Sequence, residues 1–588
     1  MQSLADTLPI AQAGPRVLTP LDTDHEFDNG SKINFTALTD VQSRNLATLA
    51  KVWGFLKYHH PAVTGGKHHW DYDLFRVMLQ VLAAGDSASA LFAISNWVGG
   101  LEAPQDCTKC ATLDPNGLYL APNLEWISDE SLLGHDLSQA LQNVYRNRTP
   151  GSSQFYVSVV PGAGNPSFDH ELAYYTSPYP DAGYRLLALF RFWNIVRYFY
   201  PNRDIMSDDP ANQPDYWNNV LAEFIPRIGL SPGITDYQQQ LMQFIARIHD
   251  THANLWTSIS SRPPIGPCQL PVDVRFVEGK ALVLRYNSPS AGPASGLMPG
   301  DVIDQLDGVP VSDLINQWRP IYADSNEAAR LRDMGTFLTR GKCGAADVVV
   351  LRGADSASIQ SARVDSNTLD FSRTNVHDLP GNAAFMKLAD DIAYVKMSWA
   401  RAADSASYIQ SAAGTKGLII DIRNYPSDFV VFTLGRLLVS APTSFARFTS
   451  VDPSNPGAIG WADMVSLTPQ EPHYSGKVVI LVDEITQSSA EYHSMGFRTA
   501  PGATVIGSTT AGADGNVSAV VLPGGYGSYI SGLGVFYPDK RPTQRVGIIP
   551  DIVVTPTIEG IRAGRDELIE EAVRQIRGEG ATSELRRQ

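Results

Sequence analysis

Two adjacent serines, Ser488 and Ser489, follow a short apolar run and open a segment with helical spacing. The run from Val478 to Val482 is continuous rather than alternating, which is typical of a strand that is covered on both faces of a sheet. Glu491 falls in the first turn of the expected helix, where a carboxylate suits the helix dipole. A hydroxyl at such a turn faces the carboxyl edge of the sheet, and unpaired N–H groups of the helix can receive a developing oxyanion. The stretch therefore predicts a nucleophilic serine, and a serine that only caps the helix is the alternative.

A histidine that could take the proton of such a serine stands at His252. The segment 241–248 keeps a helical period, and residues 250–255 are expected to form a turn that leads into a strand. Taken alone, His252 fits a structural turn residue better than a base. His249 and His252 could also share a metal on one helical face, but no third ligand is near. We expect four further histidines to lie on the surface beside a helix end rather than to bind metal: His59, His60, His68 and His69.

Composition limits the classes of function. A length of 588 residues corresponds to about three to five domains, and a hydrophobic content of 43% is enough for several cores. The net charge of −15 leaves no basic stripe for phosphates, so we expect no nucleic-acid partner. No apolar run approaches the length of a transmembrane helix, and the first fourteen residues lack the basic and apolar parts of a signal peptide.

The four cysteines bear on the compartment. An even number favours two disulfides in an oxidising compartment, although Cys107 and Cys110 could instead be half of a zinc site. Cys268 and Cys343 flank one small domain and have no zinc spacing, so we expect a bridge between them. A periplasmic or secreted protein is the corresponding expectation.

The first half of the chain contains an internal repeat. After an extended lead-in at 1–38, segments 46–61 and 186–201 share Leu, Trp, Tyr and Pro positions at an offset of 140 residues. Both segments are expected to be amphipathic helices that stop at proline. They predict two helical units, 39–164 and 165–267, of which the second ends in the His252 segment.

Short strands follow in a third unit, 268–365. In it Gly296-Leu297 precedes Pro299-Gly300-Asp301, and Asp307-Gly308 suggests a hairpin. This string closely resembles a PDZ domain, a module that adds an extended chain to a sheet edge and holds its terminal carboxylate. The resemblance implies peptide binding at Gly296 and Leu297, and a small β domain without a ligand is the alternative. Residues 347–352 are expected to close the module, and a less structured linker to run to about Pro380.

The last unit, 366–588, has an α/β pattern. Strands are expected at 392–397, 417–422, 504–507 and 543–553, with helices at 430–438 and 565–577. The second strand ends in the polar loop 421–428, at the sheet edge where such folds carry chemistry. The Gly-rich loop 508–518 lacks the lysine and the spacing of a phosphate-binding loop.

The order of these features resembles that of the C-terminal-processing and tricorn-like serine peptidases. The strings that carry the resemblance lie at 294–311, 417–424, 486–492 and 547–551. It implies a crotonase-like catalytic core with Ser488 as the nucleophile. It also implies an oxyanion hole made by the N–H of Ser489 and a donor at Ser427 or Asp428, since Pro426 cannot donate.

One departure from the family pattern decides which branch of the family the chain resembles. Processing peptidases pair the serine with a lysine in a Gly-Lys-Gly turn, whereas the matching turn here holds Asp514, and only Lys540 follows the serine. The tricorn-like branch takes a histidine from ahead of the PDZ module, with a hydroxyl residue before it, and Thr251-His252 matches. The glutamate of that branch corresponds to Gln544, so Asp514 and Asp250 remain candidates for the acid.

The sequence thus predicts a multidomain serine endopeptidase or carboxy-terminal peptidase that needs no cofactor or metal. His252 would take the proton of Ser488, which attacks a peptide or protein substrate, and a homo-oligomer is compatible. A silent ligand-binding protein that resembles the retinoid-binding proteins of the eye is the alternative. A metal-dependent hydrolase at His249 and His252 is the third possibility.

Overall fold

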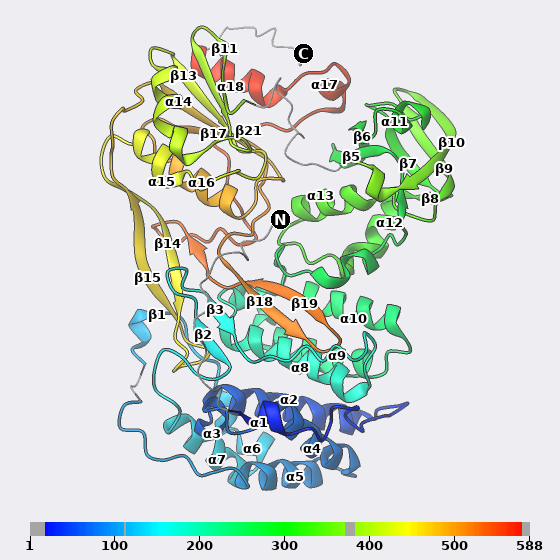
Figure 1. Ribbon diagram of the computed structural model, residues 1–588, viewed down its shortest axis with the longest axis vertical. Helices are drawn as coiled ribbons and strands as arrows, with labels where there is room; N and C mark the ends of the chain where they lie inside the picture. The colour runs from blue at the N-terminus through cyan, green and yellow to red at the C-terminus, as the bar shows by residue number, and fades with distance from the viewer. Residues whose placement is uncertain (1–17, 111–112, 371–382, 579–588) are drawn as a thin grey trace.

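The computed structural model describes residues 18–110, 113–370 and 383–578 (Figure 1). Residues 1–17 of the expected lead-in and the end of the expected linker, 371–380, therefore lie outside the described residues. Along the chain a helical region is followed by a β-rich module and then by an α/β core (Figure 1).

Helices α2 (Asp40–His59) and α8 (Ala182–Phe199) form the centre of the helical region and carry the two matching sequence segments. They pack on each other, and the Asn194 side chain donates to the Ala50 carbonyl at 3.0 Å. Each is joined to a following helix by two reciprocal indole-to-carbonyl hydrogen bonds, Trp53 with Trp70 and Trp193 with Trp217. The other long helices are α4 (Trp70–Ala83), α5 (Ser87–Gly99), α7 (His135–Arg146), α9 (Gln213–Gly229) and α10 (Ile234–Ala246).

The prediction of surface histidines is wrong for three of the four. His59, His60 and His69 are all at most 3% exposed, because the chain that follows the helices covers them. Burial lowers the pKa of His59 to about 3, so this ring is neutral and packs as an aromatic side chain against Phe55.

A buried cluster of four charges ties the helical region to the rest of the chain. Lys57 pairs with Glu171 at 2.7 Å, and Arg191 pairs with Asp71 at 2.6 Å. Because each buried charge has a partner, the cost of removing it from water is offset. Arg191 also donates to the carbonyl of Val521 at 2.9 Å, in a hairpin of the last third of the chain.

The β-rich module has the strand order β4-β10-β9-β7-β6-β5, with β8 paired to β7. The hairpin at Asp307-Gly308 is confirmed, since both residues have positive φ between β7 and β8. The linker prediction is wrong for β10, whose residues Asp355–Arg363 pair with β9 and whose last two residues pair with β4, so β9 is not the closing strand. The β10 segment alternates Ser and Ala residues and contains no apolar run, so its sequence lacks the pattern that predicts a buried strand. The strands are β4 (Cys268–Gln269), β5 (Val272–Val277), β6 (Lys280–Tyr286), β7 (Val302–Leu306), β8 (Val309–Pro310), β9 (Gly344–Arg352) and β10 (Asp355–Asp365), with α12 (Val311–Trp318) and α13 (Glu327–Phe337).

The α/β core is built on the sheet β11-β12-β13-β16-β17-β21, which is parallel from β12 onward. Helix α18 (Glu567–Arg577) covers one face, and α14 (Ser405–Ala412), α15 (Val431–Leu434) and α16 (Ser489–Phe497) cover the other. Two boundaries differ from prediction: α15 ends after one turn in a 3-10 turn, and only Ile552–Val553 of the expected last strand pairs. The strands are β11 (Phe385–Ala389), β12 (Ile392–Lys396), β13 (Gly417–Asp421), β16 (Lys477–Val482), β17 (Thr504–Gly507) and β21 (Ile552–Val553).

Two extensions of the core reach the helical region (Figure 1). The long strands β14 (Thr443–Val451) and β15 (Ile459–Leu467) end at a turn where Gly457 donates to the Tyr198 carbonyl at 2.9 Å. The hairpin β18 (Val517–Leu522) and β19 (Tyr526–Ser531) lies along α8 and β3 (Pro166–Phe168). This hairpin brings a distant part of the chain to the His252 segment.

None of the helices in the described ranges is both long and apolar enough to cross a membrane.

Both expected disulfides are present, and Cys268–Cys343 confirms the predicted pairing. Cys107 and Cys110 are bonded to each other, so the half zinc site is excluded. The two bridges close loops of very different length, with sequence separations of 75 and 3 residues.

The difference in loop length gives a stability prediction. Cys343→Ser should lower the free energy of unfolding by about 2–4 kcal/mol, because the bridge restricts a long loop in the unfolded chain. Cys110→Ser, which opens the short loop, should cost roughly half as much or less. Urea unfolding measures both, after thiol counting on denatured, unreduced protein. Equal losses for the two variants, or free thiols in the unreduced protein, would contradict the assignment.

Candidate active site

Ser488 lies at the turn between β16 and α16, where the sequence pattern placed it. Its φ is 54°, a left-handed value that a residue with a side chain adopts only when its surroundings hold it there. The holding contacts are at its N–H, which donates to the Ala513 carbonyl at 2.9 Å and to Glu491 Oε2 at 3.1 Å. The next N–H, of Ser489, has no acceptor among the described residues. The turn therefore presents a hydroxyl and a free backbone donor side by side.

Glu491 joins the nucleophile turn to the Gly-rich loop. Its buried carboxylate accepts from Thr510 Oγ1 at 2.5 Å, Gly512 N at 2.8 Å and Ala513 N at 3.0 Å. Burial raises the pKa of Glu491, while these four donors, Ser488 N included, act in the opposite direction. Its role is thus wider than the dipole effect expected from its place in the helix.

The loop after β13 supplies one of the two expected oxyanion donors. The Ser427 N–H donates to the Met397 carbonyl at 3.0 Å, so it is already engaged. The Asp428 N–H has no acceptor within the described part of the chain. Arg423 fixes the base of this loop by bonding Asp421 at 2.7 Å and Asp566 at 2.9 Å.

His252 does not lie on a helix. Helix α10 ends at Ala246, His249 has a φ of 50°, and the residues that follow lead into a 3-10 turn rather than a strand. The metal pair on one helical face is therefore not formed. No group of three or more His, Cys, Asp or Glu in the described ranges is arranged to hold a metal.

A hydrogen-bond relay orients the imidazole of His252. Ser531 Oγ donates to Asp250 Oδ1 at 3.0 Å, so it can accept from His252 Nδ1, which lies 3.0 Å away. This assigns the proton to Nδ1 and leaves the lone pair on Nε2, which has no partner among the described residues. Burial alone would raise the pKa of Asp250, but the hydrogen bond and charge of His252 and the Ser531 N–H outweigh it and lower the pKa. The carboxylate is therefore ionised and can stabilise an imidazolium.

Thr251 and Gln544 lie beside this relay and not within it. Thr251 Oγ1 accepts from the Ser325 N–H at 3.0 Å, and Gln544 Nε2 reaches Ser325 Oγ at 3.4 Å. Gln544 makes no hydrogen bond to Thr251 or His252 in the described structure. Of the acids left open by the sequence, Asp250 is the one that contacts His252.

Asp514, the residue at the position of the absent lysine, is buried and has a different environment. Gly515 N donates to its Oδ1 at 2.7 Å, and Oδ2 has no partner among the described residues. Burial, and after it the charge of Glu491, raises the pKa of Asp514 well above its usual range. This shift disfavours the ionised form, which is the form that a partner of the base would need.

One loop joins the two halves of the site. Ser488 is bonded to Ala513 at the start of that loop, and Asn516 at its end accepts from the Gly532 N–H at 2.8 Å. Gly532 follows Ser531, the residue that holds His252. Ser488 and His252 thus flank the same loop, and no direct hydrogen bond joins them in the described structure.

Three residues in this region were not predicted from the sequence. Ser531 is 279 positions from its partner His252, so no local pattern connects them. Tyr425 is 57% exposed and faces the hydroxyls of Ser488 and Ser489. Partial burial raises the pKa of Tyr425, and its hydrogen bonds with these two hydroxyls act in the opposite direction. His493 lies one helical turn after Ser489. Its position in the expected helix was the signal that could have found it.

A cavity of about 260 Å³ lies between β5, α13 and the turn that precedes the nucleophile. Arg275 of β5 closes it on one side, bonding Asp483 at 3.0 Å and Glu484 at 2.7 Å. The β-rich module is thus in direct contact with the nucleophile turn.

In the loop of the predicted peptide site, Gly296 has a φ of 77°, while Leu297 is buried and its N–H donates to Ser295 Oγ.

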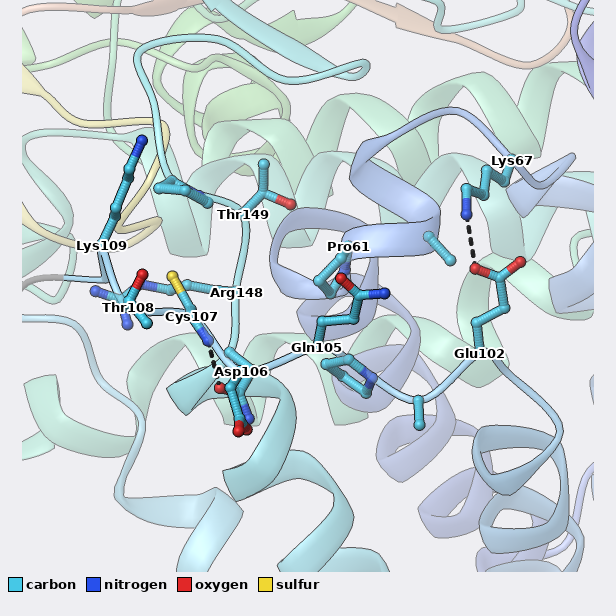
Figure 2. Close-up of a pocket in the computed structure, with 15 residues that line it drawn as sticks. Pro61, Lys67, Glu102, Gln105, Asp106, Cys107, Thr108, Lys109, Arg148 and Thr149 are labelled. Atoms are coloured by element: carbon cyan, nitrogen blue, oxygen red, sulfur yellow. Dashed lines mark hydrogen bonds and ion pairs between the residues drawn. The ribbon is translucent and has the colours of Figure 1, made fainter.

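A larger cavity, of about 510 Å³, opens in the helical region and contains no member of this site (Figure 2). Its rim carries the ion pair of Lys67 with Glu102, at 2.6 Å, and the backbone of Cys107, which donates to Asn147. Neither Ser488 nor His252 lines either of these two cavities, so neither cavity is itself the catalytic centre.

Comparisons with known proteins bear on the family signature and on the fold. Residues 391–554 match the family model of peptidase family S41. Mature CPAF has a similar fold, with a TM-score of 0.52 at 15% identity over 68% of this chain and 99% of that one. Mature CPAF complexed with lactacystin gives a TM-score of 0.51 at 14% identity over 67% and 99%. No curated protein sequence matches the chain significantly.

The matched segment contains Ser488, both loops beside it and the whole parallel part of the sheet, but not His252. The matched segment is therefore a serine-type peptidase domain, that is, a hydrolase domain. Residues 391–554 carry the signature of peptidase family S41, and the resemblance to C-terminal-processing and tricorn-like peptidases is confirmed at this level.

Proposed function

We propose that the protein hydrolyses peptide bonds through an acyl-enzyme formed on Ser488, with His252 as the general base. The observation that carries the proposal is the relay from Asp250 through Ser531 to His252, which leaves Nε2 free as a base. A histidine that had only a structural role in a turn would not need a buried carboxylate behind it.

In the first step, His252 Nε2 takes the proton of Ser488 Oγ while the oxygen attacks the peptide carbonyl. Asp250 stabilises the imidazolium that forms, through the Ser531 hydroxyl. The imidazolium then gives its proton to the leaving amine. Water, activated in the same way, attacks the ester carbonyl and releases Ser488.

The N–H groups of Ser489 and Asp428 would hold the oxyanion of each tetrahedral intermediate. Both are unpaired in the described structure, whereas the Ser427 N–H is not. Ser427 is therefore the less suitable of the two loop donors unless its bond to Met397 opens. Thr251, Ser325 and Gln544 would support the His252 turn from behind.

We assign the remaining parts by the same resemblance: two stacked helical units over 39–164 and 165–267, a PDZ-like module over 268–365 and a crotonase-like core over 366–588. The edge strand β5 with α13 beside it offers the groove in which a PDZ domain adds a peptide strand. The contact of Arg275 with the nucleophile turn supports a route from that groove to Ser488. The two disulfides support a periplasmic or secreted protein.

The PDZ-like assignment gives a binding prediction. Peptides with a free terminal carboxylate should bind the full chain more tightly than the same peptides with an amidated end. The reason is the proposed capture of that group by backbone N–H groups of the loop at Gly296 and Leu297. Fluorescence anisotropy with the Ser488→Ala variant measures binding without cleavage. Equal affinities, or no binding, would remove the carboxylate role and leave the module as a gate or spacer.

A ligand-binding protein without catalysis is the second candidate, because the family's lysine is absent from the turn at Asp514. A fluorophosphonate probe separates the two. Stoichiometric labelling of Ser488, located by mass spectrometry of a digest, indicates an activated nucleophile. No labelling of the folded protein at high probe concentration would favour the binding protein.

A further inference from the structure

His493 is a buried titratable residue to which the proposed mechanism gives no role. It lies in α16, has no exposed surface, and packs edge-on against Phe429 with ring centres 5.1 Å apart. Phe429 belongs to the loop that carries the Asp428 donor. The imidazole thus lies between the nucleophile helix and the oxyanion loop.

Both nitrogens of His493 are hydrogen-bonded to main-chain groups, one on each side. Nε2 accepts from the Val430 N–H at 2.9 Å, and Nδ1 is bonded to the Ser489 carbonyl. A carbonyl can only accept and an N–H can only donate, so Nδ1 carries the proton and Nε2 does not. With no free lone pair, this imidazole can be neither a general base nor a metal ligand.

These two contacts connect the two proposed oxyanion donors. Ser489 supplies one donor by its N–H, and His493 holds the carbonyl of the same residue. Asp428 supplies the other, and His493 holds the N–H two residues further along, at Val430. Of the N–H groups from Ser427 to Val430, only that of Asp428 is left unpaired in the described structure, since Phe429 donates to the Asp428 carboxylate.

We propose that His493 is a positioning residue that sets the separation between the Ser489 and Asp428 donors of the oxyanion hole. The inference rests on the proposed function. A rigid ring bonded at both ends is a suitable spacer, because misplacing a transition-state contact by about 1 Å can cost about 10²-fold in rate.

The protonation state of His493 suits this role. Burial lowers its pKa to about 4, although the Ser489 carbonyl and the charge of Asp428 act in the opposite direction. The neutral ring, which can donate at one nitrogen and accept at the other, is therefore the form present above that pH. Protonation would place two donors, Nε2 and the Val430 N–H, against each other.

Three variants test which contact matters. His493→Asn places an amide near Nδ1 and loses the acceptor for Val430, whereas His493→Gln can reach the position of Nε2 and keep it. We expect kcat to fall roughly 10- to 100-fold in His493→Asn with KM little changed, because the oxyanion forms only in the transition state. His493→Gln should recover most of that loss. Met495→Leu, a change to another buried side chain on the same helix, is the control for packing.

A peptide aldehyde gives a second readout, since its adduct with Ser488 carries a tetrahedral oxyanion. Its inhibition constant should rise by about the same factor as kcat falls, which a general loss of packing would not produce. If His493→Asn does not fold, Val430→Pro removes the same hydrogen bond from the loop side and should show the same kcat loss. A kcat within about threefold of wild type in the variant that folds would overturn the inference, as would equal losses in the Asn and Gln variants.

The proposed function can fail separately. If Ser488→Ala still hydrolysed peptides, the mechanism itself would be wrong. If Ser488→Ala were inactive and His493→Asn fully active, only the positioning role would be lost.

Discussion

Replacing Ser488 by alanine should lower peptide hydrolysis by at least about 10³-fold, because removal of a serine nucleophile leaves only binding and oxyanion stabilisation. The fold should persist, since Ser488 is a turn residue whose structural contacts are made by its N–H, and alanine keeps that group. Steady-state kinetics on a peptide substrate and a thermal unfolding curve for the same preparation measure the two effects.

Ser489→Ala is the matched control, because its role is through the backbone N–H that every residue except proline retains. It should keep activity to within about tenfold. If Ser489→Ala were inactive and Ser488→Ala active, the assignment of the nucleophile would be wrong by one residue.

Replacing His252 by alanine should lower kcat by about 10²-fold or more, the usual contribution of a general base. Steady-state kinetics on a peptide substrate measure this loss. The carboxylate of Asp250 carries its charge in such an assay at neutral pH, because its pKa is lowered.

His249→Asn is the control, since asparagine tolerates the left-handed φ of that position and His249 makes no contact with the relay. It should change kcat by less than about threefold. Full activity in His252→Ala with loss in Lys540→Ala or Lys396→Ala would indicate a displaced Ser–Lys pair instead. In the structure Lys540 lies over the Trp461 ring and Lys396 is buried in β12.

The Ser531 hydroxyl, which lies between His252 and Asp250, distinguishes the proposed relay from a Ser–His pair without such a link. Among the described residues it is the one link between Nδ1 and Asp250 that has good hydrogen-bond geometry, since the direct Nδ1 to Oδ1 distance is 3.4 Å. The tricorn-like resemblance led to Thr251 and Gln544 for this role. The hydroxyl and the carboxylate that contact His252 in the structure belong to Ser531 and Asp250, and the role that we propose for them rests on these contacts, while Thr251 bonds Ser325.

Local patterns were sufficient for the features made by one stretch of chain. The strand β16, the helix start at Ser489 and the hairpin at Asp307-Gly308 each depend on the order of apolar, polar and glycine residues over a few positions. The family resemblance located Ser488 for the same reason. The three donors that hold Glu491 from the Gly-rich loop were not predictable, because they lie 19 to 22 residues further along the chain.

Features made by distant segments could not be predicted in this way. The partner of His252 is 279 residues along the chain, and the Val430 contact of His493 is 63 residues away. The burial of His59 and His60 depends on which segment covers the end of α2, and histidine occurs both inside and outside proteins. The resemblance leaves the loop donor open between Ser427 and Asp428, and only the folded structure shows that the Met397 carbonyl accepts from the Ser427 N–H.

The central claim is that Ser488 and His252 act as a pair, and the most direct measurement is their separation in a crystal structure of the enzyme with a peptide aldehyde bound to Ser488. A bound peptide occupies the site, so the catalytic contact should close. We predict a distance of about 2.6–3.2 Å from His252 Nε2 to Ser488 Oγ, with the adduct oxygen between the N–H groups of Ser489 and Asp428. A lysine ammonium within that distance of Ser488, or His252 still more than about 6 Å away in the adduct, would contradict the account.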